Sequence, residues 1–148
     1  MKKNSQDIIT FAQNIFAIEA NEINTAKATI DSKFVDLTKL IVSCKGRLIL
    51  SGMGKSGHIA RKVASTFAST GTAAFFMHPG EASHGDLGMI LKEDIVIFFS
   101  NSGKSEELLS ILPNIKRIGA KIISITNNKE SFLANQSDIH INLNVKKE

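Results

Sequence analysis

Five short apolar runs, separated by stretches with helical spacing, restrict the fold of this chain more than any other feature. The runs cover residues 48–50, 73–77, 95–99, 122–125 and 139–145. Short apolar strands that alternate with helices are typical of a parallel sheet with helices on both of its faces. The sequence therefore predicts an α/β fold, a three-layer α/β/α sandwich around a five-stranded parallel sheet.

Helical spacing predicts the elements around that sheet. Residues 5–44 place apolar side chains three and four positions apart without Pro or Gly, which predicts two N-terminal helices or one helix broken within 21–29. Further helices are predicted over 59–70, 105–118 and 130–136, and Pro113 should kink or split the second of these. In the flavodoxin-like strand order 2-1-3-4-5, the first and third strands are neighbours, and ligands bind beyond the carboxyl ends of such strands.

Length, composition and charge limit the domain count and the partners. The 148 residues, 43% of them hydrophobic, can bury one ordinary core. We therefore expect a single domain over 1–148, with a helical segment at 1–45 and a βα core at 46–148. The net charge of +4 comes from scattered residues and every aromatic residue is Phe, which disfavours nucleic acid as a partner. The sequence shows no apolar run of membrane-spanning length, and we expect a cytoplasmic protein with no membrane partner.

Two copies of the pattern Ser-x-x-Gly-Lys-Ser follow the first and third predicted strands. They cover residues 51–56 and 100–105. Hydroxyls, glycines and the free amides of a helix N-terminus together favour phosphate binding. Because the two strands are expected side by side, the two loops should face each other, and we predict that a phosphorylated small molecule binds between them.

Two nucleotide-binding motifs come close to these loops but are incomplete. A P-loop needs another glycine five residues before the glycine of its Gly-Lys pair, and Ile49 and Phe98 occupy those positions. Gly52, Gly54 and Gly57 spell a dinucleotide fingerprint, but no acidic residue ends the second strand. A dinucleotide site stays open as a minor alternative.

The stretch 78–86 holds four side chains that can bind a metal: His78, Glu81, His84 and Asp86. Their spacing matches no standard zinc signature. Two histidines in the loop after the second strand nevertheless favour a functional role over a merely solvated loop. By contrast, His140 is expected to be a structural residue of the last strand.

Four blocks of residues resemble those of a known family. The blocks are 52–58, 67–72, 78–89 and 100–103, which read GMGKSGH, FASTGT, HPGEASHGDLGM and SNSG. Together they resemble the arabinose 5-phosphate isomerases of the SIS (sugar isomerase) domain family, and the resemblance covers the whole chain. It implies an aldose-ketose isomerase, an intramolecular oxidoreductase, that interconverts D-ribulose 5-phosphate and D-arabinose 5-phosphate in Kdo and lipopolysaccharide biosynthesis. It also implies a phosphorylated pentose substrate and a homotetramer whose active sites are shared between subunits.

The functional positions of that family fall on residues of this sequence. The resemblance implies catalytic roles for Lys55, Glu107 and Glu148. It implies substrate contacts at Gly71, Thr72, His78 and His84, and a phosphate loop that uses Ser100, Ser102 and Ser105. No cofactor is required, and a zinc ion that inhibits rather than catalyses is implied at His78.

Simpler explanations exist for several of these residues. The serines could cap a helix, and an acid such as Glu107 is favourable in a first helical turn on electrostatic grounds alone. A cation such as Lys55 in a first turn opposes the helix dipole, which favours a functional role for it.

Family members normally continue past the position of Glu148 into a helix, a catalytic histidine and often a pair of CBS modules. The resemblance thus implies that these 148 residues are the SIS portion only, without the C-terminal helix and the CBS pair. We expect sugar-phosphate binding to be retained better than turnover, since catalysis needs closely held groups. The alternative is a non-catalytic sugar-phosphate sensor, because SIS domains also form the ligand-binding halves of bacterial regulators.

Overall fold

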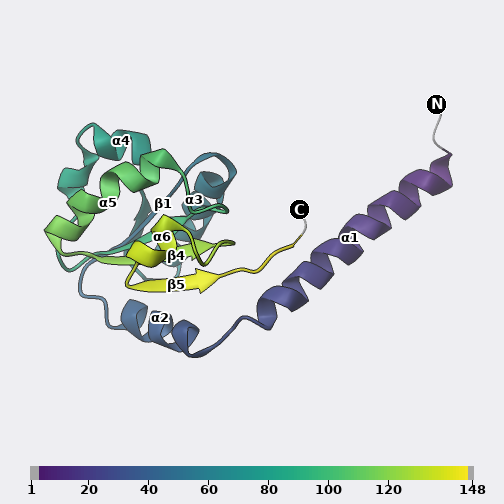
Figure 1. Ribbon diagram of the computed structural model, residues 1–148, viewed down its shortest axis with the longest axis horizontal. Coiled ribbons are helices and arrows are strands. Elements are labelled where there is room, and N and C mark those ends of the chain that lie inside the picture. Colours follow the sequence, from purple (N-terminus) through teal and green to yellow (C-terminus); the bar gives the residue numbers. More distant parts are fainter. Residues whose placement is uncertain (1–3, 147–148) are drawn as a thin grey trace. The chain divides into compact units, whose positions relative to one another are not determined.

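The computed structural model describes residues 4–146 and shows a central sheet of five parallel strands with helices on both faces (Figure 1). The strands are β1 (Leu48–Gly52), β2 (Ala74–Phe76), β3 (Ile95–Phe99), β4 (Lys121–Thr126) and β5 (Ile139–Asn142). Their order across the sheet is β2-β1-β3-β4-β5, and each pairing is parallel. The predicted α/β class and the predicted strand order are confirmed.

The helices agree with the sequence pattern except at the start of α3, near Pro113 and in the stretch 78–89. They are α1 (Ser5–Lys27), α2 (Ser32–Val42), α3 (Gly54–Ser69), α4 (Pro79–Ser83), α5 (Glu106–Ile118) and α6 (Phe132–Gln136), with a 3-10 turn at Asp86–Met89. The N-terminal stretch is two helices, one of the two predicted forms. The short helix α4 and the 3-10 turn lie in the stretch where the sequence predicted only a loop.

Helix α5 runs through Pro113 as one helix, so of the two predicted outcomes, a kink or a split, the split is wrong. Pro113 is exposed, whereas Leu108, Ile111 and Ile115 on the other side of the helix are buried against the sheet. A proline removes one backbone donor and crowds the turn before it. On the solvent side the carbonyl that loses its partner can bind water, and the buried leucine and isoleucines hold the helix in place.

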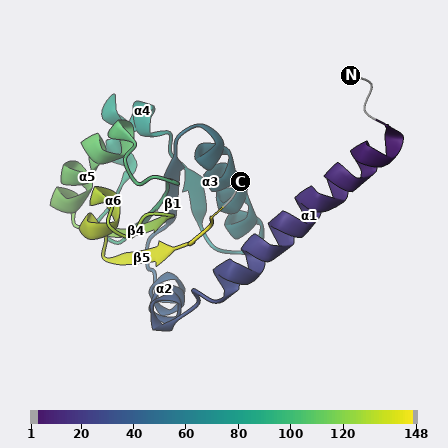
Figure 2. The ribbon, with the colours of Figure 1, turned by 45° about the vertical axis from the view of Figure 1, so that its right-hand side comes forward.

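Helices cover both faces of the sheet (Figure 2), and an apolar layer attaches them on each face. On one face, Leu48, Leu50 and Ile97 pack with α2 and α3. On the other face, Ile49 and Phe98 pack with α4, α5 and α6. Strand β1 is buried along its whole length, as expected for a parallel sheet that is covered on both faces.

The internal contacts divide the chain into two units. Residues 31–142 form the unit that contains the sheet and the helices α2 to α6. The other unit contains α1 and the segment 143–146, where the Lys146 amide donates a hydrogen bond to the Glu22 carboxylate at 2.8 Å. Within 4–146, no helix combines the length and the apolar character that crossing a membrane requires.

Candidate functional site

Two loops leave the sheet from neighbouring strands at its carboxyl edge. Gly52 ends β1 and Phe99 ends β3, and the two residues are register partners in the parallel pair. Adjacent strands lie about 4.8 Å apart. The loops therefore begin side by side, with Lys55 three residues beyond Gly52 and Ser100 directly after Phe99.

The two copies of the Ser-x-x-Gly-Lys-Ser pattern nevertheless have different structures. Ser51 lies inside β1, and its buried hydroxyl has no hydrogen-bond partner among the described residues. Ser100 is instead the first residue beyond β3. Lys55 and Ser56 of the first copy already belong to α3, whereas α5 begins only after Ser105. The first copy is thus a sharp turn into a helix, and the second is a loop along its whole length.

The loop at 100–105 is shaped by hydrogen bonds from its own serines. The Ser100 hydroxyl accepts the Gly103 amide at 3.0 Å and lies 3.3 Å from the Ser105 hydroxyl. Ser102 accepts the Lys104 amide at 3.2 Å. Ser105 occupies the N-cap position of α5, but its side chain makes no capping hydrogen bond. The first amides of α5 lack intrahelical partners, and such amides beside hydroxyls form a site for an anion.

Gly103 fixes the position of this loop against α6. Its φ of +66° lies in the left-handed region, and a β-carbon added there would be 2.5 Å from Ser131 Cβ. Ser131 is the N-cap of α6, where its hydroxyl accepts the Ala134 amide at 3.2 Å. Both the backbone angle and the close contact therefore require glycine.

Two further glycines allow α3 to approach β1. A β-carbon on Gly57 would lie 2.5 Å from the Gly52 carbonyl oxygen, and one on Gly52 would lie 2.9 Å from the Phe99 oxygen. Close packing between helix and strand thus accounts for these glycines of the fingerprint without a dinucleotide.

Lys55 and Glu107 lie at the starts of the two helices that follow these loops. Lys55 is the second residue of α3 and Glu107 the second residue of α5, and both side chains are exposed. Lys55 makes no ion pair within residues 4–146, although its charge opposes the helix dipole. The structure therefore brings Lys55, Glu107 and the three loop serines to one edge of the sheet, while Glu148 lies outside the described residues.

A hollow of about 210 Å³ lies beside the first loop. It is lined by Gly52, Gly54, Gly57, His58, Arg61, Phe76 and His78. The Arg61 guanidinium carbon lies 4.3 Å from the centroid of the Phe76 ring, and Phe76 meets His78 edge to face at 6.4 Å. Sequence reasoning missed His58 and Arg61. They follow Gly54 by four and seven positions, which is the spacing of one helix face and could have indicated them.

His78 and His84 are the N-cap and C-cap residues of α4. The His78 Nδ1 accepts the Gly80 amide at 3.2 Å, so in the neutral ring Nε2 carries the proton. A metal at Nε2 would have to displace that proton. Residues 4–146 contain no group of three His, Cys, Asp or Glu side chains arranged to hold a metal. The described part of one chain does not supply a ligand set, and zinc at His78 stays a prediction.

Gly71 and Thr72 lie at the opposite edge of the sheet. Their amides donate to the last turn of α3, to Ala68 and Phe67 at 3.3 and 2.9 Å, and β2 begins two residues later at Ala74. A five-residue strand, about 15 Å long, separates this edge from the serine loop. One chain does not bring these two predicted contact residues to the others.

An ion pair between buried Asp94 and half-buried Arg47, at the same amino edge, anchors the segment that follows His84. Arg47 donates to Asp94 at 2.9 Å and to the Met89 carbonyl at 2.6 Å, and the Leu91 amide donates to Asp94 at 2.9 Å. Burial raises the pKa of Asp94, but hydrogen bonds from Arg47 and from the amides of Leu91 and Arg47 outweigh it and hold the pKa below its ordinary value.

His140 occupies a structural position, as expected. It lies in β5, and its Nδ1 is 3.1 Å from the Ser124 hydroxyl of β4. Burial lowers the pKa of His140, a hydrogen bond with the backbone of Ser124 opposes this, and the nearby charge of Lys33 lowers it further.

These features define a parallel α/β protein with a serine-rich loop after its third strand, beside the turn that follows its first strand. The chain belongs to the SIS domain family, which matches residues 40–148. Arabinose 5-phosphate isomerase KdsD of Francisella tularensis is 49% identical over 143 residues, which are 95% of this chain and 44% of that protein. The chain thus spans less than half the length of the curated relatives it matches.

Two solved structures agree with this assignment. An Escherichia coli CFT073 protein in complex with arabinose 5-phosphate is 45% identical and superposes with a TM-score of 0.87, covering 99% of this chain and 78% of that chain. A putative sugar-phosphate isomerase from Listeria monocytogenes is 33% identical with a TM-score of 0.95, covering 99% of this chain and 77% of that chain. The resemblance to SIS-domain arabinose 5-phosphate isomerases is confirmed.

Proposed function

We propose that these residues form the SIS portion of an aldose-ketose isomerase that interconverts D-ribulose 5-phosphate and D-arabinose 5-phosphate. The observation that carries the proposal is the serine loop at 100–105, which begins beside the turn that presents Lys55. Similarity to KdsD and to the structure solved with arabinose 5-phosphate supports the choice of substrate. In this proposal the protein acts in the cytoplasm and supplies arabinose 5-phosphate for Kdo and lipopolysaccharide biosynthesis.

The phosphate end of the sugar binds at the second loop. The hydroxyls of Ser100, Ser102 and Ser105 and the first amides of α5 offer donors to the phosphate oxygens, as in other helix N-terminal anion sites. The open-chain sugar then extends toward α3, where Lys55 and the imidazole of His78 lie beyond β1 and β2.

The reaction moves a proton between adjacent carbons of the sugar. Glu107 acts as the base that removes it and returns it, and the Lys55 cation stabilises the negative oxygen of the enediolate that forms between the two steps. Only protons move, so the proposed reaction requires no cofactor. Glu148 remains a predicted third catalytic group.

Shared active sites follow from the position of Gly71 and Thr72. Since these residues lie at the amino edge, a contact between them and the substrate must come from a second copy of the chain. A homo-oligomer, in the form of a tetramer, is therefore part of the proposal.

Calorimetric titration with arabinose 5-phosphate, together with NMR detection of ribulose 5-phosphate, tests the proposal. Ser102→Ala should weaken binding about tenfold, which corresponds to the loss of one hydrogen bond to a charged group. Glu107→Gln should bind normally and form no product. Ser110→Ala on the exposed side of α5 is the matched control, and this variant should both bind the sugar phosphate and form product as the unaltered protein does. Absence of binding by the unaltered protein would refute the proposal.

A non-catalytic sugar-phosphate sensor is the second candidate. The same loop supports it, because the loop accounts for binding alone. Binding of arabinose 5-phosphate without any product from the unaltered protein would favour the sensor over the isomerase.

A further inference from the structure

Three side chains form a connected row along the hollow beside the first loop. Arg61 belongs to α3, Phe76 ends β2, and His78 is the N-cap of α4. All three line the hollow. The Arg61 guanidinium carbon lies 4.3 Å from the centroid of the Phe76 ring, and the Phe76 and His78 rings meet at 6.4 Å with 67° between their planes. Phe76 therefore connects Arg61 to His78.

The alternation of side chains along β2 explains why Phe76 and His78 share this hollow. Successive side chains of an extended segment point to opposite sides. Met77 is buried in the apolar core on the side of α4 and α5, whereas Phe76 packs against the core on the side of α3. The backbone of His78 is still extended, with φ of −74° and ψ of 129°. His78 therefore returns to the side of Phe76, where α3 presents Arg61.

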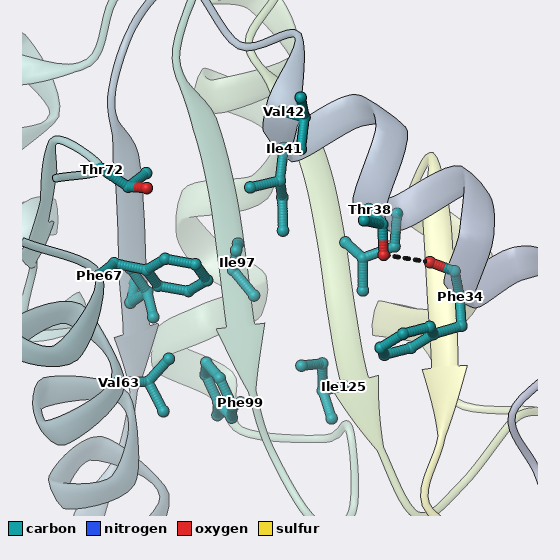
Figure 3. Close-up of a pocket in the computed structure, with 12 residues that line it drawn as sticks. Phe34, Thr38, Ile41, Val42, Val63, Phe67, Thr72, Ile97, Phe99 and Ile125 are labelled. Carbon is teal, nitrogen blue, oxygen red and sulfur yellow. Dashed lines mark hydrogen bonds between the residues drawn. The ribbon is translucent and has the colours of Figure 1, made fainter. Parts of the chain in front are cut away.

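Packing of α3 on the sheet determines where Arg61 is presented. Ala60 and Ala64 are buried beneath the helix. Figure 3 shows Val63 and Phe67 of the same helix lying over the sheet beside an apolar pocket. Arg61 takes part in no ion pair within residues 4–146. Its guanidinium is thus held over the Phe76 ring by the seating of α3 and by attraction to the ring, which a cation favours.

The imidazole of His78 is restrained from two directions although it is exposed. Phe76 meets the ring edge to face, and the Gly80 amide donates to its Nδ1 at 3.2 Å. An exposed side chain without such contacts changes rotamer freely. Because Nδ1 accepts a hydrogen bond, the neutral ring carries its proton on Nε2. That N–H is the group which remains to donate to a ligand in the hollow.

We propose that Arg61 is a positioning residue that holds His78, through Phe76, so that Nε2–H donates to an oxygen at the reacting end of the sugar. This inference rests on the proposed function, in which the open-chain sugar extends toward Lys55 and His78. A donor fixed in advance stabilises negative charge that develops on that oxygen. The hollow of about 210 Å³ is smaller than the pockets of drug-sized ligands, which are about 300–1,000 Å³. It therefore admits one end of the sugar.

Steady-state kinetics of Arg61 variants tests the positioning role. Arg61→Met removes the guanidinium and should lower kcat about tenfold while KM changes less than about twofold, because a mobile donor mainly harms the transition state. Arg61→Lys keeps a cation that can lie over the ring and should recover most of the rate. Lys62→Met is the matched control, since Lys62 donates instead to the Thr66 hydroxyl at 2.8 Å. This control should keep the kcat of the unaltered protein.

A double-mutant cycle shows whether Arg61 acts through His78. In a His78→Ala background, Arg61→Met should lower kcat no further, because the ring that Arg61 positions is gone. An equal loss in both backgrounds, or a rise in KM alone, would show that Arg61 contacts the sugar itself and would overturn the proposal. Urea unfolding of each variant should match that of the unaltered protein, since Arg61, Lys62 and His78 are all exposed.

NMR of the His78 ring tests the same contact without turnover. The ring current of Phe76 shifts the ring protons of His78, and Arg61→Met should reduce that shift whereas Lys62→Met should preserve it. Saturating arabinose 5-phosphate should move the Nε2 signal of the unaltered protein. Ring signals that ignore Arg61→Met, or an Nε2 signal that ignores the bound sugar, would overturn the proposal. A protein whose His78 ring responds to Arg61→Met but which forms no product refutes the isomerase function and leaves the positioning contact standing.

Discussion

Gly103 and Ser131 lie so close together that no β-carbon fits between them. The contact joins the loop after β3 to the N-cap of α6, two segments that are 28 positions apart in the chain. It means that the proposed phosphate loop is held in shape by a neighbouring helix and does not depend on its own hydrogen bonds alone.

Gly103→Ala should therefore damage both stability and binding. The left-handed backbone alone costs a non-glycine residue about 1–2 kcal/mol, and displacement of Ser131 adds to that cost. Urea unfolding should show the loss, and titration with arabinose 5-phosphate should show weaker binding. Gly88→Ala is the control, because a β-carbon at Gly88 meets nothing within 4 Å; an equal loss in both variants would contradict the explanation.

Alanine substitutions at Ser100 and Ser105 should distinguish a structural role of the serine hydroxyl from a role in phosphate binding. Ser100→Ala leaves the buried Gly103 amide without its acceptor, which should cost about 1–3 kcal/mol of unfolding free energy and also weaken phosphate binding. Ser105→Ala removes no cap bond, so it should weaken binding with little change in stability. The comparison needs urea unfolding and calorimetry on both variants, and a large destabilisation by Ser105→Ala would show that its hydroxyl serves the fold.

Lys55→Met should stabilise the protein while abolishing turnover. Removal of a cation from the first turn of α3 relieves its opposition to the helix dipole, by about 0.3–1 kcal/mol. Thermal unfolding and the isomerase assay measure the two effects. Lys62→Met, further along the same helix, is the control and should keep activity; a Lys55→Met enzyme with normal turnover would remove Lys55 from the mechanism.

Asp94→Asn should change how the free energy of unfolding depends on pH in the acid range. The folded-state pKa of Asp94 is lowered from 3.8, so its carboxylate stabilises the fold above that value, and the contribution disappears as pH falls through the folded pKa. The free energy of unfolding of the variant should be about 1–3 kcal/mol lower near neutral pH. It should also fall less steeply than that of the unaltered protein as the pH is lowered. Asp36→Asn, on the exposed side of α2, should follow the unaltered protein in urea titrations at each pH.

The strands could be read from the sequence because burial on both faces leaves nearly continuous apolar runs. Strand β3 has the predicted bounds, whereas β5 ends at Asn142, before the predicted end, and Asn144 then adopts a left-handed φ of 54°. The early end of β5 goes with the backbone angle at Asn144, and the apolar pattern of 139–145 does not predict that angle.

The start of α3 was harder to predict for a related reason. Glycine disfavours helix, so the pattern placed the helix at 59–70, yet it begins at Gly54 because Gly52 and Gly57 let it pack onto β1. The hollow that contains His58 and Arg61 depends on this earlier start. Likewise, the direction of β2 places Gly71 and Thr72 at the amino edge of the sheet. The local spacing of residues in the sequence does not reveal that direction.

The pairing of Gly52 with Phe99 fixes the distance between the two loops that are proposed to bind the two ends of the substrate. The separation between the proposed phosphate loop at 100–105 and the helix that presents Lys55 is set by backbone hydrogen bonds and not by side chains. Replacement of individual side chains can therefore change which sugar reacts, or how, while the span between the two ends of the substrate stays constant.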